Sequence, residues 1–146
     1  MITFEIEGVQ LPDIDFKKVS AWLMKVAAEN DRIIGTLAYR FCSEEEILRI
    51  NREFIDHDYY TDIITFENTI GRKVAADIFI SPETVRTNAE EIGEPYEKEL
   101  LRVIVHGLLH LFGIKDKTPE ERREMEAAED KALQLYEDLD PMTDEI

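Results

Sequence analysis

The feature that most constrains this chain is an apolar stretch, residues 100–116, that contains two of its three histidines. Its side chains are apolar on nearly every side of a helix, which is typical of a helix in the middle of a domain. His106 and His110 lie one helical turn apart, so both rings project from one face. A buried imidazole needs a partner for each ring nitrogen, and one metal ion satisfies two imidazoles at once. The stretch therefore predicts a central helix that carries a metal site.

A third metal ligand follows the expected end of this helix. Gly113 lies where a left-handed residue would terminate it, and Asp116 follows shortly afterwards. Three ligands, His106, His110 and Asp116, would leave the fourth position of a zinc ion open for water, as in catalytic zinc sites. The alternative is a chance spacing of two core histidines. The apolar surroundings, the glycine and the carboxylate together favour the metal site.

Hydrophobic periodicity and capping residues predict an α+β fold, in which about five helices pack on a small mixed sheet of about four strands. The strands 63–67 and 74–80 are expected to form a hairpin or to lie side by side. In the second helix, Ile47, Ile50 and Phe54 are expected to face the core. The other expected strands are residues 2–7 and 33–41, and the expected helices are approximately residues 16–30, 44–54, 82–92, 96–112 and 119–139.

Length, cysteine content and charge limit the class of protein. A chain of 146 residues is expected to form one domain. Its one cysteine excludes an internal disulfide framework and favours a reducing compartment. The N-terminus has no signal-peptide pattern, and charges interrupt every apolar run before membrane-spanning length, so a cytoplasmic protein is expected. A formal net charge of −16 argues against non-specific nucleic-acid binding, although it allows a basic cleft.

Four blocks of residues, in order between about Ser43 and Leu133, match the motifs of a known family. In HGLLHLFGIKD, six residues match the motif H-G-x-L-H-L-x-G-Y-D-H: His106, Gly107, Leu109, His110, Leu111 and Gly113. The other matches are Asn51, Asp58 and residues 61–66 (TDIITF), then Ala76, Asp77, Ile78 and Ser81, and finally Met125 and Glu129. These motifs resemble the YbeY family of bacterial endoribonucleases, which act in ribosomal RNA maturation.

The resemblance implies a metal-dependent enzyme that cleaves phosphodiester bonds in single-stranded RNA. It implies a role in maturing the 3′ end of 16S ribosomal RNA and in ribosome quality control. The small ribosomal subunit and its proteins would be partners, with no DNA and no membrane. The third histidine of the family motif falls on Asp116, a harder ligand that tolerates divalent metals other than zinc better. An arginine of the family falls on Ile55.

The general base is not evident from the motifs. Zinc peptidases of the HExxH type place a glutamate directly after the first histidine, whereas this chain has Gly107 there, which argues against a peptidase. Water activated by the metal, or the carboxylate of Asp62, is expected to do this work. Arg102 is expected to contact phosphate and Glu99 to orient a histidine. Alternatively, these two side chains form an ion pair without a catalytic role.

The sequence alone leaves two other functions open. One is a metal-dependent hydrolase of another substrate, such as a peptide. The other is a ribosome-assembly factor without catalysis, which the departures at Ile55 and Asp116 leave open. His57 is interpreted as a surface-loop histidine, with a polar role near the cleft as the alternative. Three further motif residues are interpreted as structural: Thr61, Thr65 and Asp77. Asp62 has the same structural interpretation as the alternative to its role as a base.

Overall fold

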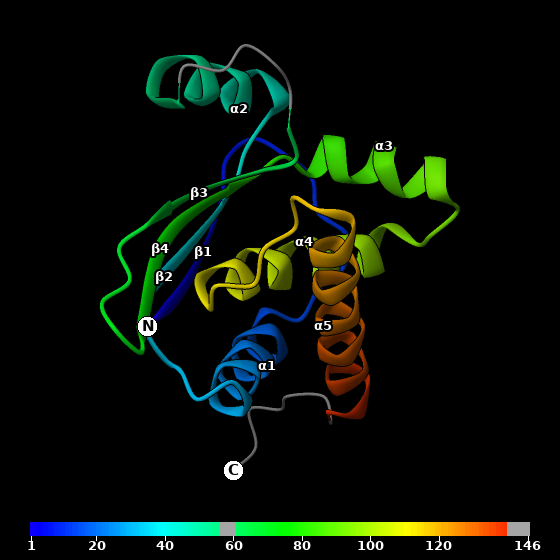
Figure 1. Ribbon diagram of the computed structural model, residues 1–146. Coiled ribbons are helices and arrows are strands. Elements are labelled where there is room, and N and C mark those ends of the chain that lie inside the picture. The colour runs from blue at the N-terminus through cyan, green and yellow to red at the C-terminus, as the bar shows by residue number, and fades with distance from the viewer. Residues whose placement is uncertain (56–60, 140–146) are drawn as a thin grey trace.

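A four-stranded mixed sheet forms one layer of the fold, and helices pack against it (Figure 1). The computed structural model describes residues 1–55 and 61–139. The strand order is β1-β2-β4-β3, with β1, β2 and β4 parallel and β3 antiparallel to β4. The predicted α+β class is therefore confirmed, as is the pairing of the third and fourth strands. The strands are β1 (Ile2–Ile6), β2 (Ile33–Phe41), β3 (Ile63–Glu67) and β4 (Lys73–Ile80).

The helices begin where the capping residues predict. Asp15 accepts hydrogen bonds from the first turn of its helix, and Ser43 and Ser81 do the same for theirs. Thr118 and Glu121 form a reciprocal capping box. The helices are α1 (Phe16–Glu29), α2 (Glu44–Ile50), α3 (Pro82–Ile92), α4 (Tyr96–Leu111) and α5 (Pro119–Asp138).

Helix α4 lies at the centre, between the sheet and α5, as its apolar sequence predicts (Figure 1). The buried Tyr39 of β2 donates a 2.7 Å hydrogen bond to the backbone oxygen of Ile104 in this helix. A Cβ atom at Gly107 would lie 3.1 Å from Ile63 and 3.2 Å from Ile78, so this glycine allows the helix to approach the sheet closely. In the described part of the chain, no helix is long and apolar enough to span a membrane.

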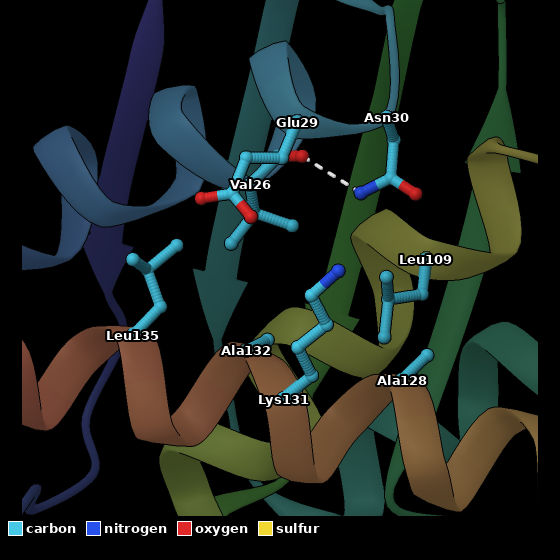
Figure 2. Close-up of a pocket in the computed structure, with 8 residues that line it drawn as sticks. All are labelled: Val26, Glu29, Asn30, Leu109, Ala128, Lys131, Ala132 and Leu135. Carbon is cyan, nitrogen blue, oxygen red and sulfur yellow. Dashed lines mark hydrogen bonds between the residues drawn. The ribbon is translucent and has the colours of Figure 1, made fainter.

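A small pocket lies where α1, α4 and α5 meet (Figure 2). Its volume is about 60 Å³, and Leu109, Ala128 and Leu135 supply part of its apolar wall. The side chains of His106 and Asp116 line a different groove. The pocket is therefore a packing gap between helices and not the expected metal site.

The prediction for Phe54 is wrong. The helix expected over residues 44–54 ends as an α-helix at Ile50 and continues as one π-helical turn, η1 (Asn51–Ile55). A π turn contains more residues than an α turn, so the face formed by Ile47 and Ile50 does not continue to Phe54. Phe54 is 62% exposed, whereas Ile47 and Ile50 are buried. His57 and Asp58 lie outside the described residues.

Candidate metal centre

The structure brings together the three side chains that the sequence predicts as metal ligands. The rings of His106 and His110 project from one face of α4, with centroids 4.6 Å apart. Gly113 has a φ of 91° and turns the chain after the helix, as its position predicts. The loop beyond it places Oδ2 of Asp116 3.4 Å from Nε2 of His106 and 3.4 Å from Nε2 of His110.

These separations fit an ion between the side chains better than direct hydrogen bonds. A charge-assisted hydrogen bond between nitrogen and oxygen is about 2.7–2.9 Å long. Two ligand atoms that are each about 2.1 Å from a tetrahedral zinc ion lie about 3.4 Å apart. The candidate ligand atoms all lie within 4.8 Å of one another. The side chains of His110 and Asp116 are 37% and 35% exposed, so one side of the cluster is open to solvent.

A buried glutamate contacts the other ring nitrogen of His106. Oε2 of Glu129 lies 2.6 Å from Nδ1 of His106, and Glu129 is 7% exposed. Arg102 donates one hydrogen bond to Oε1 of Glu129, at 2.9 Å, and another to Asp130, at 2.7 Å. The carboxylate that contacts His106 is therefore Glu129 of α5 and not Glu99, which was expected to orient a histidine.

The sequence patterns do not predict Glu129 as a neighbour of the candidate site, although Glu129 matches a family motif. A usable signal was present. Glu129 follows Met125 by one helical turn, so both face inward from α5, and both are buried. An inward-facing carboxylate on an otherwise apolar face needs a buried partner.

The protonation of His106 reflects this environment. Burial disfavours the imidazolium, but the hydrogen bond to Glu129 and the charges of Glu129, Asp116 and Asp62 outweigh it. Together they raise the pKa of His106 above its ordinary value. Burial also raises the pKa of Asp62, against the opposing charge of His106. Burial raises the pKa of Glu99 as well, against the opposing charge of Arg102.

Asp62 lines a pocket beside His106, whereas Asp77 does not. Asp62, Glu99 and His106 line one pocket of about 160 Å³, together with Arg102 and Glu129. The loop that carries Asp62 is held by a 2.9 Å hydrogen bond from the backbone N–H of Ser81 to its carbonyl oxygen. Asp77 lines a separate groove that also contains Phe79.

Comparisons with known proteins agree with this architecture. The family model described as endoribonuclease YbeY matches residues 1–137. A protein named endoribonuclease YbeY from Phocaeicola vulgatus is 53% identical over 135 residues, 92% of this chain and 98% of that protein. A Bacteroides fragilis protein of the same name is 53% identical over 134 residues, covering 92% and 96%. The solution structure of a Thermotoga maritima protein matches with a TM-score of 0.65 at 28% identity, covering 98% of this chain and 99% of that one.

Proposed function

The chain belongs to the YbeY family, and from this premise we propose that it is a metal-dependent endoribonuclease acting on single-stranded RNA. The observation that carries the proposal is the cluster of His106, His110 and Asp116, whose ligand atoms lie within 4.8 Å of one another. We propose that these residues hold one divalent ion, zinc in the first instance. Such an ion acidifies a coordinated water and polarises a phosphoryl oxygen.

We propose Asp62 as the group that accepts the proton from the attacking water. Asp62 lines the same pocket as His106, and its raised pKa brings it closer to neutrality, where a proton acceptor works most efficiently. In this step the water oxygen forms a bond to phosphorus, and the bond from phosphorus to the departing ribose oxygen breaks. One water proton passes to the Asp62 carboxylate, while the departing ribose oxygen keeps the electron pair of the broken bond and takes up a proton from solvent.

We propose ribosomal RNA as the substrate, with cleavage near the 3′ end of the 16S molecule. The proposed compartment is the cytoplasm. The motif resemblance supports this choice. The net charge of −16 supports a further point: an acidic body repels free RNA, so efficient cleavage would depend on a partner at the small ribosomal subunit.

A peptidase is the less favoured function for a structural reason. The position of the peptidase glutamate is Gly107, which is buried against the sheet. A side chain there would first meet Ile63 and Ile78, and would not reach water at the metal centre. The predicted contact of Arg102 with phosphate stays a prediction, because the observed hydrogen bonds of Arg102 go to Glu129 and Asp130.

The test compares substrates in one metal-loaded sample. Single-stranded RNA, duplex RNA of the same sequence and a denatured protein are each incubated with wild type, with and without chelator. We expect cleavage of the single strand alone, abolished by chelator and by His106→Ala, but kept by the exposed α4 variant Glu97→Gln. Proteolysis without RNA cleavage would replace the proposal with a peptidase. Subunit binding that survives His106→Ala, with no cleavage by wild type, would replace it with an assembly factor.

A further inference from the structure

We infer that Glu129, held in place by Arg102, is a positioning residue that keeps Nε2 of His106 available as a metal ligand. This inference rests on the proposed metal site and concerns how α5 prepares that site before an ion arrives. It assigns a role to an ion-pair network between α4 and α5 that would otherwise be interpreted as helix packing alone.

The contact between Glu129 and His106 fixes the tautomer of the imidazole. A neutral imidazole carries one proton, on either Nδ1 or Nε2. Because Arg102 binds the other oxygen of this carboxylate, we expect Oε2 of Glu129, 2.6 Å away, to accept the proton of Nδ1 of His106. The lone pair then lies on Nε2, the atom that faces Asp116 at 3.4 Å. The site is therefore prepared for a metal on the correct nitrogen, as carboxylate–histidine–metal arrangements require.

Arg102 holds the Glu129 carboxylate in position. Glu129 is 7% exposed, and a buried carboxylate needs hydrogen-bond partners for both of its oxygens. The guanidinium of Arg102, one turn before His106, donates to Oε1 of Glu129 and leaves Oε2 for the histidine.

The second hydrogen bond of Arg102 supplies a matched control residue. Arg102 donates this bond to Asp130, whose side chain is 59% exposed. Asp130 shares the arginine and the helix with Glu129, but no hydrogen bond or ion pair recorded in the structure joins it to a metal ligand. If the network only packed α4 on α5, loss of either carboxylate would change stability and leave zinc affinity unchanged. A positioning role makes Glu129 alone important for metal affinity.

The experiment measures zinc affinity in the full chain by competition with a chromophoric chelator, for wild type, Glu129→Gln and Asp130→Asn. We expect Glu129→Gln to weaken zinc binding by about 10- to 100-fold, and Asp130→Asn by less than about threefold, as for an exposed ion pair. Urea unfolding of the metal-free variants reports the structural contribution separately. Equal zinc affinity in Glu129→Gln and wild type would overturn the inference while leaving the metal site standing.

A second measurement does not need bound metal. The ¹⁵N chemical shifts of the His106 ring, in metal-free protein at a pH where the ring is neutral, distinguish the two tautomers. We expect the proton on Nδ1 in wild type. A ring protonated on Nε2 would overturn the inference. If wild type bound no zinc at all, both the proposed function and this inference would be overturned. If wild type and Glu129→Gln bound zinc equally well, only this inference would be overturned.

Discussion

Oδ2 of Asp116 lies 3.4 Å from Nε2 of His106, although one residue belongs to a loop and the other to the central helix. The same oxygen lies 3.4 Å from Nε2 of His110. The left-handed turn at Gly113 makes this approach possible, since it ends α4 and reverses the chain towards the histidine face. The candidate metal site is thus formed by one helix end and the loop that follows it.

Replacement of His110 should remove metal without unfolding the protein. The side chain of His110 is 37% exposed, so His110→Ala should cost the metal-free protein no more than about 0.5 kcal/mol. Zinc content and RNA cleavage should both fall to background, because two ligands remain. Elemental analysis and a cleavage assay measure these effects, with Glu97→Gln as the control. A fully active His110→Ala protein would show that the ligands are assigned wrongly.

Gly113→Ala should affect both stability and metal binding. The φ of 91° is unfavourable for alanine, and nothing surrounds a Cβ there within 4 Å, so the cost comes from the backbone and should be about 1–2 kcal/mol. Relaxation of this strain should displace Asp116 and lower zinc affinity. Gly8→Ala is the matched control, since Gly8 has a φ of 65° and open surroundings but lies in another part of the chain. Equal effects of both variants on zinc affinity would contradict the account.

Gly107→Ala tests the close packing of α4 on the sheet. Alanine favours a helix over glycine by about 1 kcal/mol, but overpacking typically costs about 1–3 kcal/mol. The new Cβ would lie 3.2 Å from Ile78, which is fully buried and has little room to move. We expect a net loss of about 1 kcal/mol in urea unfolding. A net gain in stability would mean that the helix is not held as closely as described.

The raised pKa of His106 predicts how the stability of the metal-free protein depends on pH. A group that binds its proton more tightly when folded stabilises the fold fully below its unfolded pKa, about 6.5 for histidine. This contribution disappears as the pH rises through the higher folded pKa. The free energy of unfolding should therefore decrease more between pH 6 and pH 9 in chelated wild type than in His106→Gln. Identical pH profiles for the two proteins would rule out this coupling.

The parts of the candidate site whose geometry the sequence predicts are local. The spacing of His106 and His110, the stop at Gly113 and the return to Asp116 all lie within one helix and its following loop, where helical geometry is sufficient. The contact of Glu129 with His106 depends on how α5 packs against α4, which no local pattern specifies. The prediction for Phe54 failed because a π turn changes the helical period after Ile50.

In the sheet, too, local sequence predicts the strands but not their tertiary arrangement. Alternating and β-branched residues locate the four strands, and a turn between neighbours predicts the antiparallel pairing of β3 with β4. The insertion of β4 between β2 and β3 is a tertiary arrangement. In this position β4 pairs in parallel with β2 and antiparallel with β3, and it also contacts α4.

The most direct test of the proposed metal site is the zinc content of wild type and Asp116→Ala, purified side by side without chelator and then equilibrated with the same zinc concentration. The account predicts about one equivalent of zinc in wild type and a large loss in the variant, because the 3.4 Å contacts of Asp116 complete the ligand set. Equal zinc in both proteins, or none in wild type, would contradict a centre formed by His106, His110 and Asp116.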